Sequence, residues 1–309
     1  MNLNGVGPQR NQLVKPKGEI IVTDNGKKYQ KVGIVNAAGA VVVAKLAGQA
    51  TNKAVRKLCR FPLKNLKELT KDMDADTFKQ AADKAFKNSG LREKGVKIID
   101  ATEENKNLLK NIVEKIIPKY IKNNPTAKKI YDKKIEKLVN TITSGNNAGY
   151  IPRANIIFVN KDKMSWATFH EMGHALNKKM GGIGKVLAKT RHPMALLSSI
   201  AILTAMFKRK KADGEKPQGF FDKTTTFIKE NAGKLAFIGT IPTLLEEGLA
   251  SIKGTKLAKE VLSLENYKKV KNLNARAYVT YIGMAVATGL SAYVISKIRD
   301  AIAAPQEIK

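Results

Sequence analysis

The chain carries four apolar stretches separated by lysine-rich segments. The longest, residues 277–296, has twenty uncharged residues and basic residues close to both ends. Twenty residues of helix rise about 30 Å, which matches the hydrocarbon core of a bilayer. We therefore expect a transmembrane helix at 277–296. Residues 32–44, 193–207 and 235–245 form shorter apolar stretches, and stretches of that length are more often buried core helices.

Two of the shorter stretches predict a helical hairpin. If 193–207 and 235–245 are its arms, the chain before the first arm and the chain after the second return to the same side. The link 208–234 begins with four basic residues and contains Gly and Pro. We expect this link at the opposite end of the hairpin, in water or among lipid headgroups. Segments at both ends are basic, so the positive-inside rule does not orient the hairpin.

The patterns elsewhere predict ordinary soluble elements. Residues 20–32 fit a strand, an Asp-Asn-Gly turn and a second strand, which is a β-hairpin signal. Between 58 and 140, leucine, isoleucine and phenylalanine recur at helical spacing, so we expect amphipathic helices there. The short β-branched runs 96–100 and 155–159 predict two strands of one small sheet.

These elements predict a mainly helical α+β fold with a small sheet and apolar, membrane-associated helices. At 309 residues the chain is long enough to bury a full core. Its polar start, Met1 to Gln12, lacks the apolar run of a cleavable signal peptide. Four regions are expected: an N-terminal hairpin with an apolar Gly/Ala-rich segment (1–57), an amphipathic helical region (58–140), a metallopeptidase-like core containing the apolar hairpin 193–245 (141–265), and a C-terminal apolar helix, expected to be transmembrane (266–309).

The formal net charge of +30 restricts the classes of partner. Nine of the 56 cationic side chains are arginine, and arginine is the residue that base readout and bidentate phosphate contacts favour. No RNA-binding or zinc-finger spacing is present, so we expect no specific nucleic-acid recognition. The lysines fit solvated helix faces and attraction to anionic lipid headgroups. The lone Cys59 excludes an intrachain disulfide and a cysteine-based metal site.

One motif points to specific chemistry. His170-Glu171-Met172-Gly173-His174 contains two of the three histidines of the chain at HExxH spacing. On a helix, residues four apart lie on the same face, so both imidazoles can bind one zinc ion with Glu171 beside it. We expect Glu171 to act as the general base that takes a proton from an attacking water.

A third protein ligand must come from elsewhere in the chain. Glu246 and Glu247 are adjacent carboxylates in an apolar segment, where a buried charge costs several kcal/mol unless it is paired or bound to a metal. Neighbouring helical residues point about 100° apart, so only one of the two can face the metal. The sequence favours Glu247 and leaves Glu246 open. His192 is a weaker alternative, because Pro193 beside it is expected to start or break a helix.

The motifs together resemble those of a known enzyme class. HExxH, followed at a distance by Glu247-Gly248-Leu249-Ala250-Ser251, is similar to the pattern of the gluzincin metallopeptidases. Ser251 stands where many members have an aspartate. This difference leaves the metal ligand in place, but the carboxylate that usually supports a ligand from behind is missing at this position.

Within the gluzincins, the chain is most similar to a membrane-associated group. Two features suggest this: the small residue Gly173 inside the HExxH motif, and the apolar segments between and after the two motifs. That group includes the CAAX prenyl protease and bacterial stress-related membrane metallopeptidases. The resemblance covers residues 147–260, about a third of the chain. It implies a zincin-like metal helix and a Zn²⁺ cofactor bound by His170, His174 and Glu247.

We therefore expect a zinc-dependent endopeptidase that acts on a peptide or protein substrate at a membrane, such as a bacterial inner membrane, with a cytoplasmic location as the alternative. The resemblance implies that strand 155–159 forms the edge of the substrate cleft, where an extended peptide can pair its backbone; the alternative is that this strand is only part of the core sheet. Two other classes stay open. One is a non-catalytic membrane or anionic-surface binding protein on a degenerate metallopeptidase scaffold. The other is a lipid- or nucleic-acid-binding protein with an accidental HExxH match. The intact Glu171 favours the enzyme.

Overall fold

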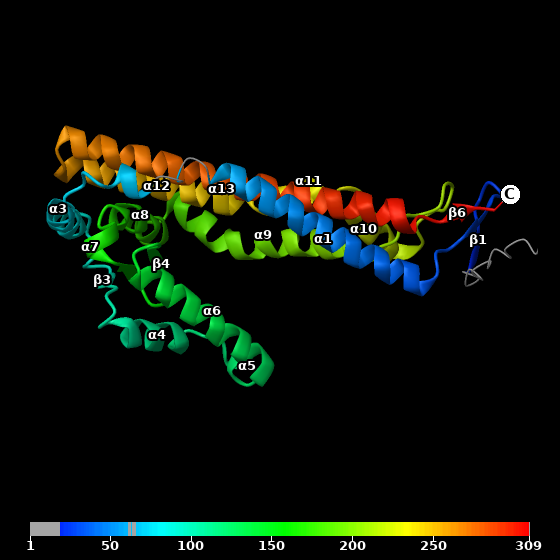
Figure 1. Ribbon diagram of the computed structural model, residues 1–309, viewed down its shortest axis with the longest axis horizontal. Helices are drawn as coiled ribbons and strands as arrows, with labels where there is room; N and C mark the ends of the chain where they lie inside the picture. Colours follow the sequence, from blue (N-terminus) through cyan, green and yellow to red (C-terminus); the bar gives the residue numbers. More distant parts are fainter. Residues whose placement is uncertain (1–18, 61–62, 64–65, 309) are drawn as a thin grey trace, which may run out of the picture.

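A long bundle of helices carries a smaller lobe at one end (Figure 1). The computed structural model describes residues 19–60, 63 and 66–308, so the predicted absence of a signal peptide at Met1 to Gln12 lies outside the described residues. The bundle contains α1 (Ile34–Cys59), α9 (Gly182–Phe207), α10 (Gly219–Glu230), α11 (Ala232–Ile238), α12 (Ile241–Val261) and α13 (Leu264–Ala303). The helices associated with the lobe are α2 (Leu66–Leu69), α3 (Ala75–Asn88), α4 (Lys106–Lys115), α5 (Lys119–Lys122), α6 (Pro125–Thr143), α7 (Lys161–Met164) and α8 (Ala167–Lys179).

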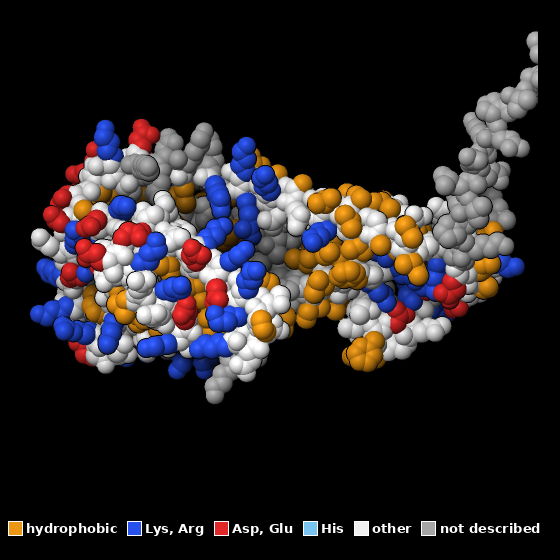
Figure 2. Space-filling view, turned by 60° about the horizontal axis from the view of Figure 1, so that its bottom comes forward, with side chains coloured by type: hydrophobic (Ala, Val, Ile, Leu, Met, Phe, Trp, Pro, Cys, Tyr) orange, Lys and Arg blue, Asp and Glu red, His pale blue; other side chains and the backbone are white. Residues whose placement is uncertain are grey.

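Three helical segments of the bundle are long and apolar enough to cross a membrane. They are Ile34–Cys59, Ala232–Val261 and Leu264–Ala303. The predicted span 277–296 is therefore the central part of a longer helix, α13, and the Gly/Ala-rich stretch after residue 32 belongs to the 26-residue helix α1. A band of apolar side chains covers the bundle between two charged regions (Figure 2). Exposed apolar side chains of the bundle include Val42, Val43, Leu46, Ile200, Leu203, Ile282, Val286 and Leu290.

Small residues allow the bundle helices to pack closely. A Cβ atom on Gly48 of α1 would lie 2.4 Å from the side chain of Ile295 in α13, and one on Gly233 of α11 would lie 2.9 Å from Tyr293. Ser198 of α9 donates a hydrogen bond to the carbonyl of Ala236 in α11 at 2.7 Å. Without a strong hydrophobic driving force between helices in lipid, such close contacts and interhelical hydrogen bonds hold apolar helices together.

The helical hairpin predicted around 208–234 is present, formed by α9 and α11. Its link lies at the end of the bundle farthest from the lobe (Figure 1). The expected helix break at Pro193 is wrong, because α9 runs through that residue from Gly182 to Phe207. An internal proline costs a helix about 3 kcal/mol or more, and the packing of α9 against its neighbours has to offset this cost.

Two small three-stranded sheets complete the fold. The predicted hairpin forms β1 (Ile20–Val22) and β2 (Lys28–Gln30), and β2 also pairs with β6 (Gln306–Glu307). The lobe contains β3 (Lys97–Asp100), β4 (Gly149–Ile151) and β5 (Ile156–Val159) in the order β3-β5-β4. The predicted pairing of the two β-branched runs is confirmed, since β3 and β5 are parallel neighbours.

The expectation that 155–159 forms the cleft edge is wrong. Strand β5 is the central strand of its sheet and all four of its residues are buried. Its backbone groups are engaged by β3 on one side and β4 on the other, so no further strand can pair with it. Strand β4, which contacts α8, is the edge strand on the side of the metal helix.

Candidate metal centre

Helix α8 carries His170, Glu171 and His174, and it packs against α12. The two helices approach closely because glycine stands at their contacts. A Cβ atom on Gly173 would lie 2.0 Å from the carbonyl oxygen of Ala250, and one on Gly254 would lie 2.3 Å from the carbonyl oxygen of Phe169. Backbone atoms cannot move aside as a flexible side chain can, so glycine is required at both positions. This close contact brings residue 247 of α12 to the two histidines.

The three side chains that the sequence favoured as ligands come together. The Nε2 atoms of His170 and His174 are 3.1 Å apart. The Oε2 atom of Glu247 lies 3.3 Å from the first and 3.2 Å from the second. Two of the residues are buried and the third is nearly so. This His170–His174–Glu247 group could hold a metal ion.

The outer nitrogen of each imidazole contacts a second side chain. His174 Nδ1 lies 2.8 Å from Glu246 Oε1, and His170 Nδ1 lies 3.2 Å from Ser251 Oγ. A carboxylate only accepts hydrogen bonds, so the contact with Glu246 favours a proton on Nδ1 of His174, and Nε2 would then be the nitrogen that binds a metal ion. Outer contacts of this kind fix the ring orientation of metal-bound histidines. For His170, the contact comes from the hydroxyl group of Ser251. The gluzincin pattern often has aspartate at this position.

Glu246, the alternative third ligand, has a different position. Its side chain is almost fully buried and is surrounded by His174, Asn177 and Arg191. Asn177 Nδ2 donates to its Oε1 atom at 3.1 Å, and Arg191 Nη1 donates to its Oε2 atom at 3.1 Å. Its carboxylate is thus engaged on the outer side of His174. His192 is exposed and is not part of the group of potential ligands in the described part of the chain.

Glu171, the predicted general base, is buried beside the group. Its side chain points away from bulk water, and burial raises the pKa of its carboxyl group, although the neighbouring histidines oppose the shift. The backbone of Tyr150 in β4 lies near it and also opposes the shift. Desolvation of a carboxylate strengthens its basicity, which a general base requires. Strand β4, at the edge of its sheet, therefore contacts the part of α8 that carries Glu171.

One functional candidate was missed by the sequence analysis. The hydroxyl group of Tyr281 in α13 lies near Glu247 and interacts with its carboxylate. Tyr281 lies inside the apolar run 277–296. The hydropathy of that run predicts a membrane-spanning helix and gives no sign of a role at the metal group. Only the packing of α13 against α12 brings Tyr281 to the site.

The spacing of the donor atoms is compatible with a single bound metal ion. In a tetrahedral site with bonds of about 2.0–2.1 Å, ligand atoms are roughly 3.3 Å apart, and the three donor atoms here are separated by 3.1, 3.2 and 3.3 Å. Two neutral imidazoles and one carboxylate leave a fourth position for water or substrate, as in catalytic sites.

No protein-family profile, no curated protein and no solved structure matches this chain.

Proposed function

We propose that the protein is a zinc-dependent endopeptidase that acts at a membrane surface. The observation that carries this proposal is the triangle of His170 Nε2, His174 Nε2 and Glu247 Oε2, with all three sides between 3.1 and 3.3 Å. Glu171 lies next to this triangle on the same helical turn. The set provides both a metal site and a desolvated base, which are the two parts that hydrolysis of an amide requires.

Each residue has a role in the proposed mechanism. When bound, a zinc ion supplies a Lewis acid that polarises the scissile carbonyl and lowers the pKa of water. Glu171 accepts the proton of the attacking water and passes it to the leaving nitrogen. Tyr281 lies near Glu247, and its hydroxyl group is a candidate donor to the developing negative charge on the substrate oxygen.

The position of the site in the bundle supports a membrane-proximal substrate. Tyr281 lies near the start of the apolar run of α13, and Gly248 packs against Tyr278 one turn earlier. Exposed apolar side chains of α12, Leu245 and Ile252, lie close to Glu247 in sequence. Strand β4 offers a sheet edge to which an extended peptide can add its backbone. A peptide segment that leaves the apolar layer can thus reach the site.

Glu171→Gln tests the proposal. Glutamine keeps the size and hydrogen bonding of the side chain but cannot take a proton at neutral pH. We expect a fall of about 10²- to 10⁴-fold in peptide hydrolysis, which is the usual contribution of a general base, while one equivalent of zinc per chain stays bound. Exposed Glu93 of the lobe provides a matched control, since Glu93→Gln should leave activity unchanged.

The outcomes separate the function classes. His170→Ala should lose the zinc ion because it removes one of the ligands. If wild-type protein purified with zinc in the medium contains none, the metallopeptidase proposal is wrong. If the protein binds zinc but neither it nor Glu171→Gln cleaves any of a broad peptide library, the non-catalytic binding protein replaces it.

A further inference from the structure

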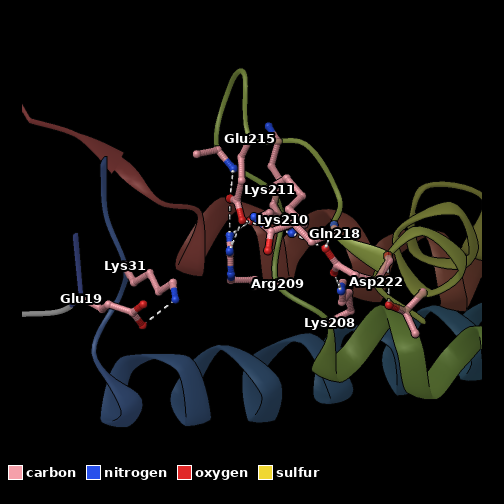
Figure 3. Close-up of polar contacts among 11 residues, drawn as sticks. Glu19, Lys31, Lys208, Arg209, Lys210, Lys211, Glu215, Gln218 and Asp222 are labelled. Carbon is pink, nitrogen blue, oxygen red and sulfur yellow. Dashed lines mark hydrogen bonds and ion pairs between the residues drawn. The ribbon is translucent and has the colours of Figure 1, made fainter. Parts of the chain in front are cut away.

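A second polar site lies at the other end of the bundle, far from the metal centre. The link between α9 and α10 folds over the ends of α10, α11 and α13, and a cavity of about 250 Å³ lies between them. Figure 3 shows this link and its charged side chains. Five cations line the cavity: Arg209, Lys210, Lys211, Lys229 and Lys297. The two carboxylates of the lining are Glu230 and Asp300.

The link is held in place by its own ion pairs. Glu215 binds Arg209 and Lys211, and it also accepts a hydrogen bond from the backbone N–H of Ala212 at 2.9 Å. Asp222 binds Lys211 at 2.6 Å and also pairs with Lys208 (Figure 3). Arg209 and Lys211, which line the cavity, therefore have fixed positions. The pKa of Glu215 falls to about 2, because these cations outweigh the effect of its burial.

Two cations of the lining have no carboxylate partner among residues 19–60, 63 and 66–308. Lys210 is exposed and forms no ion pair. Lys297 places its ammonium group 5.5 Å from the ring centre of Tyr293 and forms no ion pair either. These two lysines come from the link and from α13, and both reach the same cavity. An anion bound there would meet two unneutralised charges from opposite walls.

Two buried groups in the wall of the cavity also need a partner. Thr226 is 8% exposed, and its hydroxyl oxygen has no hydrogen-bond partner among the described residues. Lys229 is 4% exposed, and its ammonium group pairs only with Asp300, at 2.7 Å. Burial lowers the pKa of Lys229 despite this pair. A buried hydroxyl without a partner and a poorly compensated ammonium group both favour an additional anionic acceptor.

The surroundings of the cavity indicate a lipid as the source of the anion. Helix α10 exposes Phe220, Phe221 and Phe227 beside it, with exposed fractions of 75%, 83% and 59%. Exposed aromatic side chains next to cations are typical of helices that lie in a membrane interface. Lys297 follows the apolar run of α13 directly. It lies sixteen residues beyond Tyr281, or about 24 Å along the helix, which places the cavity and the metal centre near opposite faces of a bilayer.

We propose that this cavity binds the phosphate group of an anionic phospholipid in the leaflet opposite the metal centre. Lys210 and Lys297 bind the phosphate oxygens from two sides. The Thr226 hydroxyl donates a hydrogen bond from the wall, and α10 inserts its phenylalanines among the acyl chains. Basic pockets between apolar helices are a known mode of headgroup recognition.

The experiment measures lipid binding to the full chain in a neutral detergent by native mass spectrometry. The probes are dioctanoyl phosphatidic acid, dioctanoyl phosphatidylcholine and inorganic phosphate. The pocket variant Lys210→Ala/Lys297→Ala is compared with Lys223→Ala/Lys234→Ala, which removes two exposed lysines of α10 and α11 outside the lining. Thr226→Val removes the buried hydroxyl without changing charge. Circular dichroism and thermal unfolding report whether each variant is folded.

We expect phosphatidic acid to bind at least tenfold more tightly than phosphatidylcholine, since each basic residue near a surface contributes roughly a factor of five to anionic lipid binding. The pocket variant should lose this preference and Thr226→Val should weaken the binding of phosphatidic acid, while the control variant should keep both. Inorganic phosphate at equal concentration should not compete. The proposal is overturned by equal binding of the two lipids. It is also overturned by equal losses in the pocket and control variants, or by full competition from inorganic phosphate, which would indicate a site for soluble anions.

Discussion

Glu246 and Glu247 are neighbours in the sequence, yet the structure gives them different tasks. Glu247 faces both Nε2 atoms of the histidine pair. Glu246 faces the outer nitrogen of His174 and is neutralised by Arg191. The division follows from helix geometry, because successive side chains point about 100° apart. Only one of the two carboxylates can therefore face the Nε2 pair.

Substitution of each glutamate should therefore have a distinct effect. Glu247→Ala removes a ligand, so zinc should be lost on dialysis. Glu246→Ala should retain zinc with an affinity reduced about 10- to 100-fold, as is usual when the partner of a metal-bound histidine is removed. Metal analysis after dialysis against graded chelator concentrations measures both. Loss of zinc only in Glu246→Ala would contradict the ligand assignment.

At the scale of elements, the contact between α8 and α12 determines whether the metal group exists at all. Small residues stand on both helices at this contact: Gly173 on α8, and Ala250 and Gly254 on α12. The sequence showed Gly173 inside the metal motif, but not the reason for it. The carbonyl oxygen of Ala250 occupies the space that a side chain at 173 would need. The helices would separate if any larger residue stood there.

Gly173→Ala should therefore disturb both stability and metal binding. Its Cβ atom would meet backbone atoms at 2.0 Å, so we expect at least the 1–3 kcal/mol that overpacking typically costs, together with weaker zinc binding. Thermal unfolding and zinc titration measure the two effects. Gly39→Ala in α1 is a matched control, because a Cβ atom there meets nothing within 4 Å. Unchanged zinc affinity in Gly173→Ala would contradict the close approach of the two helices.

For the whole molecule, the connections between elements set the number of crossings. Strand β2 near the start pairs with β6 at the end, so the first and last described segments lie on the same side. The chain can return to that side only after an even number of crossings, whereas hydropathy identifies three candidate spans. Helix α9 joins the lobe to the link at the far end (Figure 1). If the other three segments span a membrane, α9 must be the fourth membrane crossing. Its charged residues Lys185, Lys189 and Arg191 lie at the end of the helix nearest the lobe.

Cysteine labelling tests this arrangement. Cys59→Ser removes the only native thiol, and Lys87→Cys or Asp213→Cys then places one thiol on the lobe or on the link, both at exposed positions. In sealed vesicles of uniform orientation, a membrane-impermeant maleimide should label only one of the two variants. After the vesicles are opened with detergent, it should label both. Equal labelling of the two in sealed vesicles would place lobe and link on one side and contradict the spanning arrangement.

The sequence by itself determined what depends on local spacing. The histidine pair follows from the i, i+4 period of one helix, the hairpin at 20–32 from its turn residues, and the apolar helices from uninterrupted runs. The choice between Glu246 and Glu247, the central position of strand β5 and the role of Tyr281 were decided only by the tertiary structure. So was the meeting of Lys210 with Lys297 in one cavity. Each of these depends on which faces of distant segments pack together, and local propensity carries no information about that contact.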